Sequence, residues 1–365
     1  EAYGLAPPVD SDRGPATRRA TLEGRTSQAV GPEVVLGRGG FAADTVPEGS
    51  LVAVPDGRGG WAMGDTPAAA RQVAGKVPGR RTPAAAIPPL DVPDGDWDAE
   101  IRTSWVEPAY LETDASWCVP GGEPASPLAN GGAFGAKLGS EAPAAARSLA
   151  NEHECPVVVL VSREDSVLTG AKRPPVAGGA RADGTGRLRV VRTPGIAEAV
   201  ATVAPGLKVE EVDVPGPPTS ANLRAAGWAE AVVLLTGSGA MTPGQPVVSP
   251  EGAEATAVID HDAIRVTVRC GEPLDEVVLR SYCIGAAHMA WSWITSEGLS
   301  VDDDGVVHDL TVRSFGIVRA TETPTITVEV LADDGLPVNG SDAVFAAVAA
   351  ATWCHRGCPP ELPTG

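Results

Sequence analysis

The residues best suited to holding a ligand lie in a glycine-rich stretch and in a later stretch that contains an arginine. The first is Gly131-Gly132-Ala133-Phe134-Gly135-Ala136-Lys137, and the second is Leu223-Arg224-Ala225-Ala226-Gly227-Trp228-Ala229-Glu230. Glycines let backbone amides approach an anionic ligand, and a helix that follows adds the positive end of its dipole. A guanidinium offers several donors in one plane to phosphate or similar oxygens. The two stretches predict a site for an anionic cofactor, while each alone also fits an ordinary loop or a surface arginine.

Local patterns predict the elements that must position these stretches. Ser140 is expected to cap a helix over residues 141–151, and the apolar run 156–161 predicts a strand. The Asp-Gly pair within residues 182–186 favours a hairpin. Loop, helix and strand therefore follow the glycines in that order.

The last third of the chain changes to a pattern of strands and longer apolar helices. The final helix is expected to begin with Ser341 or Asp342 as its N-cap. Strands are predicted over residues 264–268, 277–279, 310–314 and 326–330, and helices over 284–295 and 341–353.

These stretches resemble, in the same order, the pterin-binding loops of the large subunit of molybdenum hydroxylases, the xanthine dehydrogenase, aldehyde oxidase and aerobic carbon monoxide dehydrogenase family. The resemblance implies an α+β (mixed α/β) fold, with a small N-terminal hammerhead-like domain followed by a shortened molybdopterin-binding-type domain pair. Further segments carry it: Ser162–Asp165, Gly170–Pro174, Gly285–Ala290 and Thr295–Gly298. We predict an extended arm over residues 1–25, a small α/β domain over 26–95, and molybdopterin-binding-like units over 96–245 and 246–365.

The resemblance also implies which residues contact the molybdenum cofactor. In the family, backbone groups of the two loops contact the molybdopterin and the ligands of the metal. By resemblance, Gly131, Gly132, Phe134 and Gly135 make the contacts of the family's glycine-rich loop. Arg224, Ala225 and Gly227 make those of its arginine-containing loop.

The family places its catalytic glutamate in a Gly-x-Gly-Glu turn, where it takes a proton from the metal-bound oxygen. This chain has Val338-Asn339-Gly340-Ser341-Asp342 at that place. Asp342 is therefore the candidate catalytic base, and the alternative is that it caps the last helix. The stretch between Trp117 and Gly131 is also too short for the family's glutamine-bearing loop. We expect weak catalysis or none.

The resemblance implies a subunit of a molybdenum hydroxylase complex that hydroxylates an aldehyde or an N-heterocycle with oxygen from water. Because the chain has no cysteine framework for clusters, its expected partners are an iron–sulfur subunit and an FAD subunit, with a full-length molybdenum large subunit as a further candidate. The alternative is a non-catalytic structural or assembly subunit without the cofactor, or a cofactor-insertion factor derived from the same family.

Composition narrows the environment of the protein. The net charge of -19 opposes binding to nucleic acid phosphates, and no apolar run reaches the length that spans a bilayer. Six cysteines scattered over 365 residues favour free thiols and a cytoplasmic location. The terminal Cys354-His355-Arg356-Gly357-Cys358 could suggest a metal site, but no neighbouring segment supplies a second pair of ligands.

Overall fold

The computed structural model describes the chain except for residues 1–35, 37–38, 76–84, 129–130, 262 and 274, so the predicted arm lies outside the described residues. The chain forms two compact units, and neither is continuous in sequence. Unit 1 comprises Glu1–Val77, Tyr110–Ala133 and Lys137–Ser166, and unit 2 comprises Pro78–Ala109, Phe134–Ala136 and Val167–Gly365. The four predicted domain ranges stay a prediction.

Unit 1 is a four-stranded sheet with a helix on each face. The strand order is β2 (Trp61–Gly64), β1 (Leu51–Pro55), β5 (Val157–Leu160) and β4 (Ala115–Cys118), and only β1 and β5 pair in parallel. Alternate residues of β1 face opposite sides: Val52 and Val54 pack toward helix α3 (Pro67–Ala74), and Ala53 packs toward α4 (Ala142–His153). Helices cover both faces of this sheet, so β1 and β5 need apolar residues at successive positions.

Unit 2 contains a five-stranded sheet built around a hairpin. The Asp-Gly turn joins β6 (Val176–Ala180) to β7 (Gly186–Val191), as predicted. The short helix α6 (Ile196–Val203) leads from β7 to its parallel neighbour β8 (Leu207–Val212). The other edge of the sheet is formed by β3 (Ala99–Thr103) and β13 (Glu361–Leu362).

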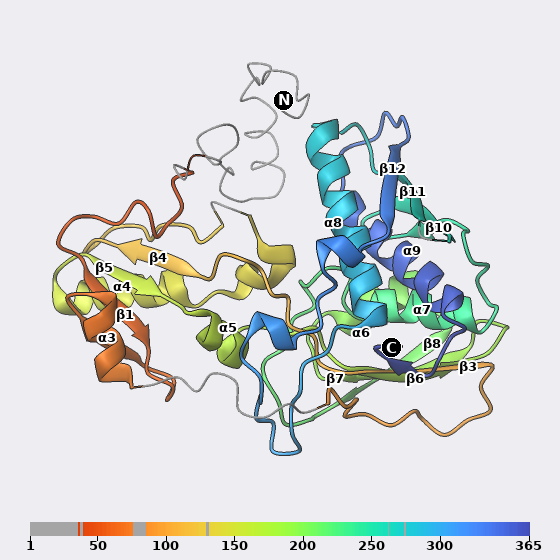
Figure 1. The fold of residues 1–365 in the computed structure, drawn as a ribbon, viewed down its shortest axis with the longest axis horizontal. Coiled ribbons are helices and arrows are strands. Elements are labelled where there is room, and N and C mark those ends of the chain that lie inside the picture. The colour runs from red at the N-terminus through yellow and green to blue at the C-terminus, as the bar shows by residue number, and fades with distance from the viewer. Residues whose placement is uncertain (1–35, 37–38, 76–84, 129–130, 262, 274) are drawn as a thin grey trace. The chain divides into compact units, whose positions relative to one another are not determined.

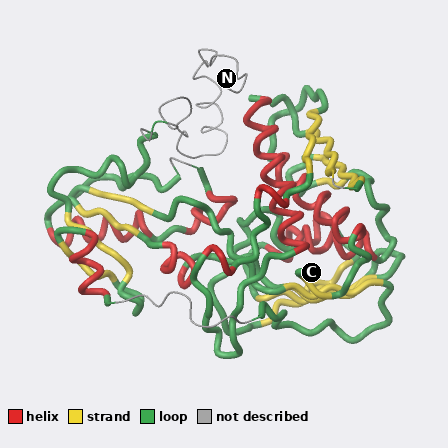
Figure 2. Tube along the Cα trace, in the orientation of Figure 1, coloured by secondary structure: helices red, strands yellow, loops and turns green. Residues whose placement is uncertain are grey.

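A second sheet of unit 2 and three long helices complete the core. Helix α7 packs on β3 and β6, α9 packs on α7 and α8, and α9 also lies against β10 and β11 (Figures 1 and 2). Nearly every residue of α9 is buried, which its many alanines permit because they let helices and sheet approach closely. The bounds are α7 Trp228–Gly237, α8 Glu276–Thr295, α9 Gly340–His355, β9 Val247–Val248, β10 Glu254–Asp260, β11 Ala263–Arg269 and β12 Thr325–Val330.

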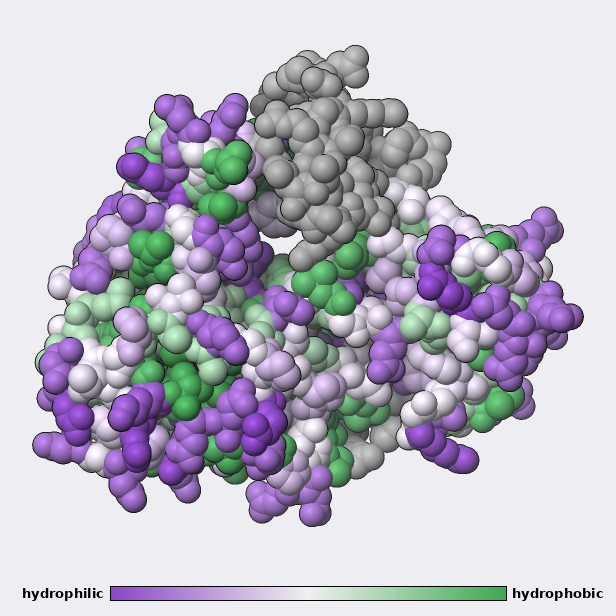
Figure 3. Space-filling view, turned by 180° about the vertical axis from the view of Figure 1, so that it is seen from behind, coloured by the Kyte–Doolittle hydropathy of each residue, from purple (hydrophilic) through white to green (hydrophobic). Residues whose placement is uncertain are grey.

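The remaining short elements connect these layers. They are the helix α5 (Arg163–Thr169) and three 3₁₀ turns, η1 (Ala133–Gly139), η2 (Val312–Ser314) and η3 (Ala320–Glu322). Among the residues drawn in colour in Figure 3, hydrophilic side chains are interspersed with smaller apolar groups. In the part of the chain that the structure describes, no helix combines the length and apolar character needed to cross a membrane.

The structure confirms most of the predicted elements and corrects four predictions. Ser140 is not the N-cap residue of the first predicted helix, because α4 begins at Ala142 and Glu141 precedes it without a capping side-chain hydrogen bond. The strand predicted over residues 310–314 is wrong, because residues 312–314 form the 3₁₀ turn η2. The strand predicted over residues 277–279 is wrong, because α8 begins at Glu276, where the Asp275 side chain accepts a hydrogen bond from the Val278 amide at 3.0 Å. The predicted N-cap of the last helix is also wrong. Asn339 is the cap, and its side chain accepts from the Ser341 amide at 3.1 Å. Asp342 is thereby released from the capping role.

Candidate functional site

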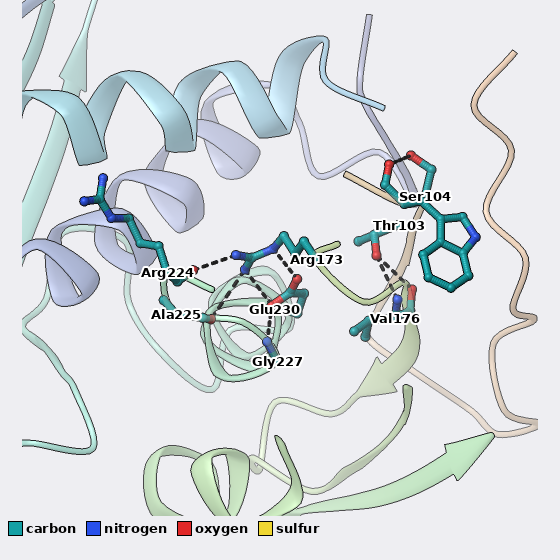
Figure 4. Close-up of polar contacts among 9 residues, drawn as sticks. Thr103, Ser104, Arg173, Val176, Arg224, Ala225, Gly227 and Glu230 are labelled. Atoms are coloured by element: carbon teal, nitrogen blue, oxygen red, sulfur yellow. Dashed lines mark hydrogen bonds and ion pairs between the residues drawn. The ribbon is translucent and has the colours of Figure 1, made fainter. Parts of the chain in front are cut away.

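A buried ion pair holds the loop that contains Arg224. The guanidinium of Arg173 donates through Nε and Nη2 to the two carboxylate oxygens of Glu230, at 2.7 and 2.8 Å (Figure 4). Its third nitrogen donates to the backbone carbonyl of Arg224 at 2.7 Å, and the Gly227 amide donates to Glu230 at 2.9 Å. A bidentate, charge-assisted pair is among the stronger polar contacts and fixes direction as well as distance. The loop from 224 to 227 is therefore pinned at both ends.

Aromatic rings also hold the Arg173 guanidinium. Its central carbon lies 4.3 Å from the centroid of the Trp293 ring on α8 and 4.7 Å from that of Phe345 on α9. The two rings stack on each other with centroids 5.5 Å apart. Since cation–π attraction is strongest away from water, these rings help to keep the charge of Arg173 inside the protein.

Arg224 itself is buried and has poorer partners than Arg173. Its guanidinium carbon lies 4.9 Å from the Phe134 ring centroid, and Nη1 lies 3.3 Å from the sulfur of Met289. Nε lies 3.7 Å from a carboxylate oxygen of Asp342. A thioether is a weak acceptor, so Arg224 keeps donor capacity beyond these contacts.

The charges of Arg224 and Asp342 depend on each other. Burial lowers the pKa of Arg224, and the attraction of Asp342 opposes that shift. Burial raises the pKa of Asp342, opposed first by Arg224 and then by hydrogen bonds from its neighbours. The structure therefore brings the candidate base beside the candidate cofactor ligand, where each stabilises the charge of the other.

A cavity of about 30 Å³ lies next to this ion-pair system, with room for one or two water molecules. Its polar lining comes from Glu107, Arg173, Arg224 and Glu297. Apolar side chains close the remaining walls: Val106, Pro108, Phe134, Leu223, Met289, Trp293 and Phe345. The cavity is thus a small, mostly apolar recess in unit 2 with four charged residues in its lining.

Glu297 is the residue of the cavity best placed to exchange a proton. Burial raises its pKa to about 7, opposed by a hydrogen bond with Ser292 and by the charge of Arg173. A carboxyl group that titrates near neutral pH can act as an acid or as a base under ordinary conditions. Glu297 is therefore a candidate proton donor or acceptor among the residues that line the cavity.

A second buried ion pair includes Glu107, which lines the cavity. Nζ of Lys172 lies 3.0 Å from a carboxylate oxygen of Glu107, and both side chains are almost inaccessible to solvent. Burial lowers the pKa of Lys172, and the attraction of Glu107 opposes the shift. Removing either partner would leave the other charge buried and unpaired, so the pair is expected to stay together.

Part of the predicted cofactor site lies together within unit 2. The Arg224 amide donates to the Phe134 carbonyl at 2.9 Å, and Ala225 follows in the same loop. Gly131 and Gly132 belong to unit 1, where the Gly131 amide donates to the Leu128 carbonyl at 2.9 Å. The cofactor roles of these residues stay predictions.

Two of the predicted glycines are required by packing within the protein. A Cβ atom on Gly135 would lie 1.6 Å from the carbonyl oxygen of Asn222, and its φ is +101°. A Cβ atom on Gly227 would lie 2.4 Å from a methyl group of Ile196, and its φ is +80°. The space that these glycines leave is therefore taken by the protein itself.

These observations test whether the site fits a molybdopterin. Pockets for ligands of that size usually measure about 300–1,000 Å³, some tenfold or more above the cavity found here. The Gly227 amide and the space beside Gly135 are already occupied by protein groups. The described residues of unit 2 do not fit this cofactor as an enclosed pocket. No group of three or more side chains able to hold a metal ion occurs among the described residues.

Glu107, Lys172, Arg173, Glu230 and Glu297 have no role predicted from the sequence. A signal was present for Glu230, which is the only charged residue between Trp228 and Gly237. A carboxylate in such a run is costly to bury unless it is paired, so a partner could have been expected. The partner could not be named, because Arg173 lies 57 residues away.

Comparisons with known proteins bear on the fold. No family model matches the sequence, and no curated protein matches it. The crystal structure of quinoline 2-oxidoreductase from Pseudomonas putida 86 is similar over 91% of this chain and 95% of that chain, with a TM-score of 0.58 and 9% identity. This likeness shows a shared fold with that oxidoreductase and confirms the predicted mixed α/β class.

Two other solved structures match more weakly. A reconstituted CO dehydrogenase from Oligotropha carboxidovorans has a TM-score of 0.26 and 10% identity, over 53% of this chain and 36% of that chain. An aldehyde oxidoreductase from Desulfovibrio gigas has a TM-score of 0.30 and 13% identity, over 79% of this chain and 47% of that chain. This chain therefore spans less than half the length of either protein, and both matches are too weak to carry an argument.

Proposed function

We propose that this protein is a subunit of a molybdenum hydroxylase-type oxidoreductase complex, in which it does not hold the cofactor alone. The complex would oxidise an aldehyde or an N-heterocycle with oxygen from water. Electrons would pass to iron–sulfur and FAD subunits. The fold shared with quinoline 2-oxidoreductase and the order of the sequence motifs support the proposal.

The observation that carries this proposal is the Arg224 loop. Its residues are those that the resemblance connects with the cofactor, and the Arg173–Glu230 pair holds them rigidly. A loop pinned in this way presents Arg224 without the entropy cost of ordering a mobile side chain on binding. The donor capacity of Arg224 would then serve an anionic group supplied by a partner subunit.

One observation favours the alternative, a non-catalytic assembly subunit derived from the same family. The cavity has room for water but not for a cofactor, and protein groups fill the space beside two of the predicted glycines. In this alternative the Arg173–Glu230 pair only stabilises unit 2. The two functions differ in what copurifies with the chain and in whether the complex needs it for turnover.

The test is to isolate the tagged full-length protein under native conditions with its partners. Molybdenum and pterin are quantified per chain, and copurifying chains are identified by mass. We expect molybdenum and pterin to be present in the complex. Both should be lost from this chain when the partner subunits are removed. Stoichiometric cofactor on the separated chain would overturn the assignment to partners. Absence of molybdenum and of any oxidoreductase partner would overturn the proposal as a whole.

A matched pair of variants separates the two functions. Arg224→Met removes the guanidinium and keeps an apolar side chain of similar length, while Arg313→Met removes a positive charge from the short turn η2. We expect Arg224→Met to lower the cofactor content or turnover of the complex without dissociating it. Equal cofactor content and turnover in both variants would favour the assembly function.

A further inference from the structure

Two thiols meet at the end of the last helix. The sulfur atoms of Cys354 and Cys358 lie 3.8 Å apart, and both side chains are half-buried and free. By contrast, Cys118, Cys270 and Cys283 are buried in the core. The pair therefore combines close approach with access from solvent.

Local chain geometry brings the two thiols together. The Gly357 amide donates to the Cys354 carbonyl, and the Cys358 amide donates to the Trp353 carbonyl, both at 3.0 Å. Gly357 has a φ of +82°, so the helix ends in a Schellman motif, which folds the following residue back over the last turn. The position of Cys358 beside Cys354 thus follows from the glycine between them.

The segment after Cys358 is anchored as well. The indole nitrogen of Trp353 donates to the Pro359 carbonyl at 2.9 Å, and the Arg102 amide donates to the Pro360 carbonyl at 2.6 Å. Strand β13 then pairs with β3. The helix before Cys358 and the segment after it are thus both fixed, so Cys358 is held near Cys354. Little chain entropy therefore remains to be lost when a disulfide bond forms between the two sulfurs.

We propose that Cys354 and Cys358 form a reversible disulfide by exchange with a small-molecule disulfide such as oxidised glutathione. The Cys358 thiolate attacks one sulfur of the glutathione disulfide and releases one glutathione thiolate. The Cys354 thiolate then attacks the Cys358 sulfur of the mixed disulfide and releases the second. Two cysteine thiols are oxidised and one glutathione disulfide is reduced, and the two cysteine protons end on two glutathione molecules.

Geometry and acidity set the order and the speed of these steps. A disulfide needs a sulfur–sulfur distance of about 2.05 Å, which side-chain rotation can approach from the observed contact. Burial raises the pKa of Cys354 to about 12, with a further contribution from Cys358. Burial also raises the pKa of Cys358, but a hydrogen bond with Cys354 opposes that shift. Cys358 is therefore the attacking thiol, and closure is slow at neutral pH.

The test uses the native full-length protein in buffers with a series of ratios of oxidised to reduced glutathione. Free thiols are blocked with N-ethylmaleimide, and peptides are mapped by mass. We expect the peptide that contains both cysteines to lose two hydrogens as the ratio rises. The closure rate should increase about tenfold per pH unit between pH 7 and 8.5, because the thiolate fraction does so below the pKa.

Variants locate the attacking and resolving thiols. Cys354→Ser should stop at a mixed disulfide on Cys358, and Cys358→Ser should remain unmodified. Cys155→Ser, which changes a half-buried thiol elsewhere, should close at the wild-type rate. A wild-type protein that resists closure when native but closes after unfolding would overturn the proposal. A lasting mixed disulfide on wild-type Cys358 would also overturn it, since Cys354 would then not be within reach.

Discussion

Replacing Glu297 by glutamine should change how the stability of the protein depends on pH. The folded protein raises the pKa of this carboxyl from 4.5 to about 7 because the side chain is buried. One pKa unit corresponds to about 1.4 kcal/mol, so ionised Glu297 costs about 3 kcal/mol in the folded state. A glutamine side chain at this position would carry no charge at any pH and could still hydrogen-bond to Ser292.

The sign of the effect follows from proton uptake. Between pH 4.5 and 7 the folded state keeps a proton on Glu297 that the unfolded state has lost. Stability therefore falls as pH rises through this range and levels off above it. We expect wild type and Glu297→Gln to have similar free energies of unfolding at pH 5. At pH 8 the variant should be more stable by up to about 3 kcal/mol.

The assay is urea unfolding of both proteins at pH 5, 6, 7 and 8, followed by far-ultraviolet circular dichroism. The difference between the two proteins is compared across pH, so that other titrating groups cancel. Glu276→Gln, an exposed change at the start of α8, the helix that ends two residues before Glu297, is the matched control and should give a difference nearly independent of pH. A constant difference for Glu297→Gln would refute the argument, because it would mean that burial does not shift the carboxyl. A variant less stable than wild type at pH 8 would mean that pairing with Arg173 outweighs burial.

Three further changes and one control substitution, Gly285→Ala, test the packing around the Arg224 loop by urea unfolding. Gly135→Ala should lower the free energy of unfolding by about 3 kcal/mol or more, from a steric clash and a strained φ. Gly285→Ala, at a helical glycine with open space around it, should instead be neutral or stabilising by up to about 1 kcal/mol; equal effects at the two glycines would contradict the packing argument. Glu230→Gln should cost about 3–5 kcal/mol because Arg173 stays buried without its counter-charge, and a loss below about 1 kcal/mol would show that water replaces the carboxylate. Asp342→Asn should cost less, about 1–2 kcal/mol, since its ion pair is long at 3.7 Å; a larger loss than in Glu230→Gln would reverse the ranking of the two pairs.

The elements that the sequence predicted well are those with local causes. The hairpin between β6 and β7 follows from one Asp-Gly turn, and α9 follows from an apolar run with polar residues before it. The error at residues 277–279 has a local cause too. Two valines favour a strand there, but the cap at Asp275 and the packing of the helix that follows decide the outcome.

The candidate site could be predicted only in part, because its partners are distant in sequence. Arg224 and Asp342 were selected separately, and the structure places them 3.7 Å apart. The pairing of Arg173 with Glu230 depends on how a loop and a helix pack, and no spacing in the sequence encodes it. The raised pKa of Glu297 is likewise a property of its burial, which composition does not reveal.

The interleaving of the two units limits how this gene can change by recombination. Unit 1 ends at Ser166, yet unit 2 already contains Pro78–Ala109. A single breakpoint anywhere in the chain therefore divides at least one unit, and neither unit can be gained, exchanged or lost intact as one continuous piece of coding sequence. A recombination event that keeps both units intact must therefore transfer them together.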